Sequence, residues 1–317
     1  MVLINDNDLK PLYFTMAVAA LSFLIKRAYQ STDVYDFFNI KKKCNPFPQS
    51  QSELVDLLHY QKRMVFNKSI IETLKYVDRK LFLENENVEN PYYDEPKPIG
   101  YNATISAPHM HALMLDLLAD RIPMSNGVAL DIGSGSGYVT ACLARLMGCT
   151  GRVIGVEHIP ELIERSAESI KRLDSTLLDT IQFLVGDGIK GWKELKYDII
   201  YLGAAIESLQ VARELIDQLK NGGRIVMPVG KSNDFHELMV VDKNQDGIVS
   251  IKSLGVVRFI PLTSKENQLN PQNIPNATKV TNINGEKTLI RCEVIPAPDS
   301  NSNNSIKEFE SLLNQNK

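Results

Sequence analysis

Residues 128–137 read VALDIGSGSG, and this stretch is the strongest indication of the fold. A short apolar run reaches Asp131 and is followed at once by a turn with glycine at every second position, Gly133, Gly135 and Gly137. Glycine permits tight backbone geometry, and the helix that follows offers free N–H groups and the positive end of its dipole. Such a strand, turn and helix are typical of a doubly wound sheet that binds a ligand at the carboxyl ends of its strands.

The sequence around this stretch alternates short apolar runs with helical stretches. Strands are predicted at 128–132, 152–156, 181–185, 197–202, 224–229, 237–242 and 248–260, and helices at 109–121, 138–147, 160–173 and 210–219. The last of these helices is expected to close at Gly222 and Gly223. Strands separated by helices imply right-handed crossovers. We therefore expect an α/β fold with a Rossmann-like, doubly wound, mostly parallel sheet and antiparallel strands late in the chain.

The segment before the sheet is predicted to hold two helices and a loop. Ser52 followed by Glu53 indicates a helix start, and residues 69–83 have the apolar spacing of an amphipathic helix. Residues 84–100 are acidic and contain three prolines, so we expect a loop there.

The composition divides the chain into three parts. Residues 1–50 hold an apolar segment and a linker, residues 51–269 hold the α/β domain, and residues 270–317 form an Asn-, Pro- and Ser-rich tail. The apolar segment within residues 12–27 is shorter than the roughly 20 residues of a membrane-spanning helix, and two aspartates precede it where a targeting peptide normally carries positive charge. We expect an added helix in a cytoplasmic protein, with membrane anchoring, organelle targeting and disorder as the alternatives.

The totals of charged residues and cysteines argue against several classes of partner. There are 35 basic and 38 acidic residues among 317, a net charge of −3, so the surface has no general attraction for nucleic acid. The four cysteines form no CxxC pair, which is typical of free thiols in a reducing compartment. His109, His111 and His158 lack the carboxylates and the spacing of a metal site, so we expect no metal.

The glycine turn also indicates which ligand is bound. A dinucleotide fingerprint requires G-x-G-x-x-G, and the register fails from Gly133 and again from Gly135. The pattern present, Asp-x-Gly-x-Gly-x-Gly, resembles motif I of S-adenosylmethionine-dependent methyltransferases. Glu157 ends the next predicted strand, where a carboxylate can accept hydrogen bonds from ribose hydroxyls, and Asp187 ends the third. The predicted cofactor is S-adenosyl-L-methionine.

Residues 99–112, IGYNATISAPHMHA, indicate the acceptor. Here the chain resembles the protein-L-isoaspartate (D-aspartate) O-methyltransferases, whose signature contains the TISAPHMHA run. The resemblance continues through ALDIGSGSGYVTACLARLMGC, GRVIGVEHI, LVGDG, GGRIVMPVG and RFIPLTSKENQ, and it covers about residues 52–268.

The resemblance implies a set of site residues. Ser106 would be catalytic. The cofactor and substrate pocket would be formed by Ile105, Ala107, Pro108, His111, Asp131, Gly133, Gly135, Gly137, Glu157, His158, Asp187, Gly188, Thr263 and Gln268. It also implies a monomer that methylates L-isoaspartyl residues, with D-aspartyl residues as a second candidate acceptor, in damaged proteins. The methyl ester would then cyclise spontaneously to a succinimide.

The chemistry of this transfer is compatible with a serine. A carboxylate is already ionised at neutral pH and needs no general base. A hydroxyl at Ser106 can hold it without neutralising it. Two other functions stay open: a non-catalytic methyltransferase-like substrate adaptor of a ubiquitin ligase, and a methyltransferase that acts on a small molecule or RNA.

Overall fold

The computed structural model describes residues 44–84, 88–231 and 235–270, together with Lys307, Glu310, Ser311 and Asn314. Apart from Cys44, these residues belong to one compact unit, Asn45–Lys317. The amino-terminal apolar segment and most of the tail lie outside the described residues, so the expectations for them stay predictions. Within the described part of the chain, no helix is long and apolar enough to cross a membrane.

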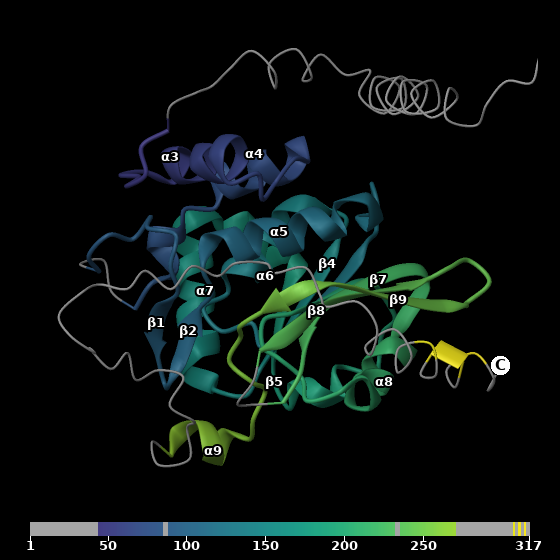
Figure 1. Cartoon of the computed structure of the whole chain (residues 1–317). Coiled ribbons are helices and arrows are strands. Elements are labelled where there is room, and N and C mark those ends of the chain that lie inside the picture. The colour runs from purple at the N-terminus through teal and green to yellow at the C-terminus, as the bar shows by residue number, and fades with distance from the viewer. Residues whose placement is uncertain are drawn as a thin grey trace, which may run out of the picture. The chain divides into compact units, whose positions relative to one another are not determined.

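The described residues form a seven-stranded sheet in the order β5-β4-β3-β6-β7-β8-β9 (Figure 1). Its strands are β3 (Val128–Ile132), β4 (Arg152–Glu157), β5 (Ile181–Val185), β6 (Tyr197–Leu202), β7 (Leu219–Val229), β8 (His236–Lys243) and β9 (Val249–Val257). Strands β3 to β7 pair in parallel, whereas β8 and β9 pair antiparallel. The prediction of a mostly parallel sheet with late antiparallel strands is therefore confirmed.

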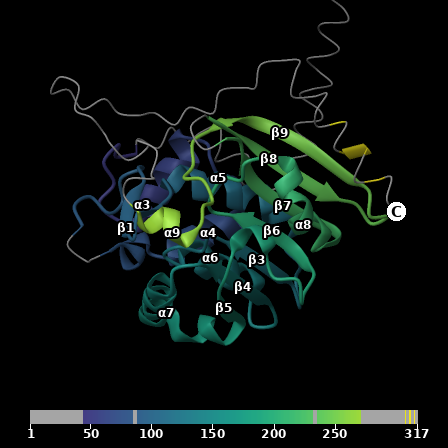
Figure 2. The same cartoon turned by 90° about the horizontal axis from the view of Figure 1, so that it is seen from below.

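Helices cover both faces of this sheet (Figures 1 and 2). The faces are covered by α5 (Pro108–Leu118), α6 (Tyr138–Met147), α7 (Pro160–Asp174) and α8 (Leu209–Asp217). The other helices of the described residues are α3 (Gln51–Asp56), α4 (Lys68–Tyr76) and α9 (Lys265–Leu269), with a π-helical turn η1 (Leu57–Gln61) and short 3₁₀ helices η2 (Arg79–Phe82), η3 (Ala119–Arg121), η4 (Ser175–Thr180) and η5 (Gly188–Lys190). Successive residues of a strand point to opposite faces. Accordingly, Ala129 of β3 packs in one core with α3 to α7, and Leu130 packs in a second core with α8.

Two predictions about the first helices are wrong. Helix α3 begins at Gln51, because Ser50 is its N-cap and the Ser50 hydroxyl accepts a hydrogen bond from the Glu53 N–H at 3.3 Å. The helix predicted over 69–83 ends at Tyr76. The next residues are extended, and Asp78 caps the separate helix η2.

The boundary between α8 and β7 also differs from the prediction. The helix ends at Asp217 and β7 begins at Leu219, so Gly222 and Gly223 lie inside a strand instead of closing the helix. A Cβ at Gly223 would lie 2.8 Å from the Asp198 carbonyl oxygen of the neighbouring strand. The lack of a side chain at Gly223 therefore allows β6 and β7 to lie close together where the register of their pairing shifts.

Residues 84–100, predicted to be a loop, end in a strand. Strand β1 (Lys97–Gly100) pairs antiparallel with β2 (Ala103–Ile105). Tyr101 and Asn102 connect them, with φ of 53° and 56°. Positive φ at both turn positions is the geometry of a tight hairpin turn that matches the twist of its strands. This hairpin delivers the chain to Ser106 and then to α5.

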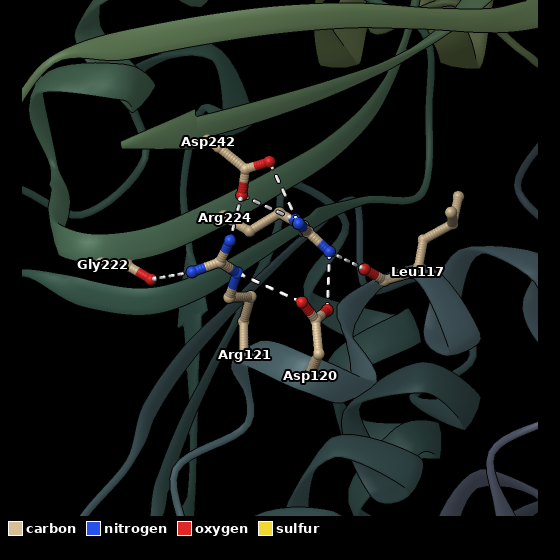
Figure 3. Close-up of polar contacts among 6 residues, drawn as sticks. All are labelled: Leu117, Asp120, Arg121, Gly222, Arg224 and Asp242. Atoms are coloured by element: carbon tan, nitrogen blue, oxygen red, sulfur yellow. Dashed lines mark hydrogen bonds and ion pairs between the residues drawn. The ribbon is translucent and has the colours of Figure 1, made fainter. Parts of the chain in front are cut away.

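An ion-pair network holds the far end of α5 against the sheet (Figure 3). Arg224 of β7 donates to the Leu117 carbonyl at 2.6 Å and to the Asp120 carboxylate at 2.7 Å. It also forms two hydrogen bonds with the Asp242 carboxylate, at 2.8 and 3.0 Å. Such bidentate pairs fix geometry as well as adding energy. The network therefore sets the position of α5, whose other end adjoins Ser106.

Candidate active site

A cleft opens at the carboxyl ends of the parallel strands. Its wall combines the β1–β2 hairpin, the glycine turn after β3, the ends of β4 to β6, and the segment from β9 to α9. The lining residues are Asn102, Ala103, Thr104, Ser106, Gly133, Gly135, Val156, Glu157, His158, Gly186, Gly188, Gly203, Ala204, Ile260, Pro261, Leu262, Thr263 and Gln268. The hairpin that precedes the sheet in the chain and the segment that follows its last strand therefore line the same cleft.

The glycine turn has no side chain at Gly133 that would fill part of the cleft. Gly133, Gly135 and Gly137 all have positive φ, at 70°, 53° and 79°. A Cβ at Gly133 would have as its nearest neighbours Ala204 and Leu262, both lining residues, at 3.7 Å and beyond. A side chain there would therefore project into the cleft, and glycine keeps that space for a ligand. Gly137 differs from the other two, because it caps α6 outside the lining residues.

Glu157 is the carboxylate of the cleft wall. It ends β4 and is 7% exposed. Its carboxylate accepts hydrogen bonds from the main-chain N–H groups of Gly135 (3.0 Å), His158 (2.8 Å) and Ile159 (3.1 Å). These bonds connect the glycine turn to the end of β4 and fix the orientation of the carboxylate. A ligand hydroxyl that reaches Glu157 therefore finds a preorganised charged acceptor.

The other two predicted acids lie beside the cleft. Asp131 is 1% exposed beneath the glycine turn and accepts a hydrogen bond from the Thr140 hydroxyl at 2.6 Å. Asp187 caps η5 by accepting from the Ile189 N–H at 3.0 Å, and its side chain is half exposed. The neighbouring Gly186 and Gly188 line the cleft in its place. Asp131 thus joins the turn to α6, and Asp187 stands at the rim.

The ionisation of Asp131 predicts a pH dependence of stability. Burial raises the pKa of Asp131 to about 7, with the Thr140 hydrogen bond opposing and the negative Glu157 adding to the rise. The unfolded carboxyl ionises near its ordinary value of 3.8, whereas the folded one keeps its proton until about pH 7. The Asp131 contribution to folding should therefore decrease as pH rises from about 4 to about 7 and stay constant above that.

Asp131→Asn should remove this contribution. In urea unfolding without cofactor, the free energy of unfolding of the original protein relative to the variant should fall by about 2–4 kcal/mol between pH 4 and pH 8. An unchanged difference across that range would show that Asp131 ionises normally in the folded protein.

Ser106 lies in the short link between β2 and α5, is half buried and is one of the residues that line the cleft. The residues predicted around it, Ile105, Ala107, Pro108 and His111, are buried and do not line the cleft. Pro108 starts α5, where its missing N–H has no helical partner to lose. Burial lowers the pKa of His111 well below its usual value, and its ring packs against Tyr138 at a centroid distance of 4.9 Å. These residues form the packed support beneath Ser106.

Gln268 of α9 connects three parts of the cleft wall. Its side-chain amide donates to the Tyr101 carbonyl at 3.0 Å, and its main-chain carbonyl accepts from the Asn102 side chain at 2.8 Å. Its amide oxygen lies 2.8 Å from Nε2 of His158, next to Glu157. Figure 2 shows α9 beside β1. The late segment thus closes over the hairpin and the end of β4, and Thr263 lines the same wall.

Several residues that line the cleft were not predicted from the sequence. These are Asn102, Ala103, Thr104, Val156, Gly186, Gly203, Ala204, Ile260, Pro261 and Leu262. Gly203 and Ala204 directly follow β6, so the rule that ligands bind at the carboxyl ends of strands could have found them. Asn102, Ala103 and Thr104 lie within the informative stretch 99–112, and the remaining residues are apolar or glycine and carry no chemical signal of their own.

The cleft suits S-adenosyl-L-methionine better than a pyrophosphate. The described residues that line it include the Glu157 carboxylate but no lysine or arginine. A sulfonium cofactor is cationic and has ribose hydroxyls, so a fixed carboxylate is a suitable partner, whereas a pyrophosphate would lack a counter-charge. In the described part of the chain, no group of three or more His, Cys, Asp or Glu residues could hold a metal ion.

Comparisons with known proteins agree with this assignment. The family model of protein-L-isoaspartate(D-aspartate) O-methyltransferases matches residues 49–267. A probable protein-L-isoaspartate O-methyltransferase of Dictyostelium discoideum is 91% identical over 99% of this chain and 100% of its own length. Protein-L-isoaspartate O-methyltransferase 1 of Arabidopsis thaliana is 47% identical over 65% of this chain and 88% of its own.

A solved structure is also similar. It is a putative protein-L-isoaspartate O-methyltransferase of Plasmodium falciparum in complex with S-adenosyl-L-homocysteine. The match has a TM-score of 0.60 and 29% identity, over 68% of this chain and 99% of that one. From the signature around Ser106, the glycine turn and these matches together, the chain belongs to the protein-L-isoaspartate(D-aspartate) O-methyltransferase family.

Proposed function

We propose that this enzyme transfers the methyl group of S-adenosyl-L-methionine to the free carboxylate of L-isoaspartyl residues in damaged proteins, with D-aspartyl residues as a second acceptor. The observation that carries the proposal is the position of Ser106. Ser106 lines the same cleft as Gly133, Gly135 and Glu157, so acceptor and cofactor can meet there. The family match and the 91% identical relative support the same reaction.

The cofactor supplies a sulfonium-activated methyl group, which is the difficult part of the chemistry. Glu157 would accept hydrogen bonds from its ribose hydroxyls. Gly188 and the rim residue Asp187 would contact the adenine edge, and the open glycine turn would leave room for the remainder. The hydrogen bonds from Gly135, His158 and Ile159 to Glu157 mean that this acceptor is in place before any ligand arrives.

The protein's remaining task is to orient the acceptor. Its carboxylate has a pKa near 4 in solution and attacks without a general base. The Ser106 hydroxyl would donate a hydrogen bond to one carboxylate oxygen and leave the other free to attack the methyl carbon. Orientation of this kind can lower a barrier by about 7–11 kcal/mol. The methyl ester would then leave the cleft and cyclise to a succinimide without further help from the enzyme.

The alternative of a non-catalytic ubiquitin-ligase adaptor has no support in the relatives named above. An adaptor would not require Ser106, Glu157 and an open glycine turn at one cavity. We also propose that residues 51–269 are the catalytic domain, with residues 1–50 and 270–317 as additions, since the family match covers residues 49–267. A cytoplasmic monomer that does not bind nucleic acid is our expectation, in line with the net charge of −3.

Unbiased identification of the acceptor tests this function. The full chain is incubated with isotopically labelled S-adenosyl-L-methionine and a protein extract aged at neutral pH, and the methylated peptides are identified by mass spectrometry. We expect base-labile methyl esters at isoaspartyl positions derived from Asn and Asp. Base-stable methylation of lysine, arginine or RNA in the same extract would contradict the proposal.

A further inference from the structure

A buried arginine outside the cleft contacts the catalytic segment. Arg79 begins η2 and is 0% exposed. One arm of its guanidinium, Nη1, donates to the Ser106 carbonyl at 2.9 Å, and the other, Nη2, donates to the Glu95 carbonyl at 3.1 Å. Its Nε is buried without a hydrogen-bond partner among the described residues. The contacts of this cation are therefore main-chain oxygens of two segments instead of a carboxylate.

Both of these segments adjoin the start of α5, one along the chain and the other through hydrogen bonds. Ser106 precedes the helix by two residues. Glu95 follows Asp94, whose carboxylate accepts from the His109 N–H at 2.8 Å, lies 2.9 Å from His109 Nδ1, and pairs with Lys62. The first turn of α5 is thus held on one side by Asp94 and on the other by Arg79. Moving Arg79 would release Ser106 and loosen the loop that fixes His109.

The main chain of Arg79 is held by a hydrogen bond to the first helix. Gln51 of α3 accepts a hydrogen bond from the Arg79 N–H at 3.2 Å. The same Gln51 side chain donates to the Leu74 carbonyl at 2.5 Å and lies 3.4 Å from the Tyr138 hydroxyl. The main chain at Arg79 is therefore tied to α3 and α4, and its side chain extends from this frame toward Ser106. The position of Ser106 at the cleft therefore depends, through Arg79, on the positions of α3 and α4.

Burying a cation lowers the stability of the fold unless its charge is compensated by other groups. Removing an ion from water carries a penalty of several kcal/mol, and main-chain carbonyls compensate it only in part. Burial lowers the pKa of Arg79 to about 10, so the group still carries its positive charge at neutral pH. The acceptor of the proposed reaction is an anion that must approach Ser106. A positive charge one hydrogen bond behind Ser106 favours that approach.

We propose that Arg79 is a positioning residue for methyl transfer. It acts through Ser106: its planar fork holds the Ser106 carbonyl and the Glu95 carbonyl together, which directs the Ser106 hydroxyl at the acceptor carboxylate. The inference rests on the proposed role of Ser106. Lysine keeps the charge but cannot form the same two-armed contact. Arg79→Lys therefore separates the geometry of the fork from the charge.

The first test compares Arg79→Lys with a matched control. Arg165 also donates to a main-chain carbonyl of the hairpin region, that of Ile99, at 2.8 Å, but among the described residues it forms no hydrogen bond with Ser106. For an isoaspartyl peptide, Arg79→Lys should lower kcat by about tenfold or more, because a hydrogen bond to a charged group is lost behind the reacting residue. S-adenosyl-L-homocysteine affinity should stay within about threefold, and Arg165→Lys should leave kcat within about twofold.

A double-mutant cycle distinguishes positioning from a purely structural role. If Arg79 acts through Ser106, Arg79→Lys should change kcat by less than about twofold once Ser106 is alanine. An equal loss in both backgrounds, or an unchanged kcat in the single variant, would overturn the inference. So would a loss of kcat accompanied by an equal loss of cofactor affinity, which would make Arg79 a scaffold residue of the whole domain. Inactivity of the original enzyme on the peptide would instead refute the proposed function.

Discussion

Ser106→Ala is expected to lower kcat for isoaspartyl methylation by about 10- to 100-fold. The hydroxyl would donate a hydrogen bond to a charged acceptor, and such bonds contribute about 1.5–3 kcal/mol. The affinity for S-adenosyl-L-homocysteine should be unchanged, because Glu157 and the glycine turn are the proposed cofactor contacts and do not require the Ser106 side chain. Stability should also change little, since Ser106 is half buried and its carbonyl contact to Arg79 is kept.

Steady-state methyl transfer and titration calorimetry check both parts of this expectation. Ser208→Ala is the matched control. Ser208 is another half-buried serine just before a helix, and its hydroxyl makes no capping hydrogen bond in α8. If Ser106→Ala kept full kcat, or if Ser208→Ala lost as much, Ser106 would have no special role in catalysis.

Glu157→Ala should abolish cofactor binding at ordinary concentrations, with affinity at least about 100-fold weaker. The ribose hydroxyls lose a charged acceptor, which alone corresponds to about 1.5–3 kcal/mol. The N–H groups of Gly135, His158 and Ile159 lose theirs at the same time. Since these bonds connect the glycine turn to the end of β4, the loss extends beyond the direct contact, and the free energy of unfolding should fall by about 2–4 kcal/mol.

Titration of S-adenosyl-L-homocysteine measures the affinity, and urea unfolding measures the stability. Glu161 stands four residues later, on the exposed first turn of α7, and Glu161→Ala should affect neither. An unchanged dissociation constant in Glu157→Ala would mean that the cofactor binds elsewhere or in another orientation.

The elements nearest the glycine turn could be predicted to the residue. Val128–Ile132 and Tyr138–Met147 match because a run of buried apolar residues, a glycine turn and a helix with an apolar face each leave a local pattern. The Tyr101-Asn102 hairpin turn could not be predicted. Its positive φ values are unusual for a tyrosine, and the hydrogen bonds that Asn102 and Tyr101 form with Gln268, 166 and 167 residues away, are invisible in local sequence.

The burial of Arg79 is a second feature that local sequence does not predict. In sequence it stands within an amphipathic stretch, where a charged residue usually faces solvent. In the structure the helix stops at Tyr76, and the new direction of the chain turns Arg79 inward to Ser106 and Glu95. Burial of a charge depends on distant carbonyls, so only the fold reveals it. The motif identified Ser106, and the structure identified what supports it.

The specificity of the enzyme for isoaspartate can be measured by methyl transfer from labelled S-adenosyl-L-methionine to two synthetic peptides. The peptides differ only in carrying L-isoaspartate or L-aspartate at one position. We expect base-labile methyl ester on the isoaspartyl peptide and none above background on the aspartyl peptide. Equal transfer to both peptides would contradict the assigned specificity. No transfer to either, with S-adenosyl-L-homocysteine still bound in the cleft, would contradict the assigned reaction.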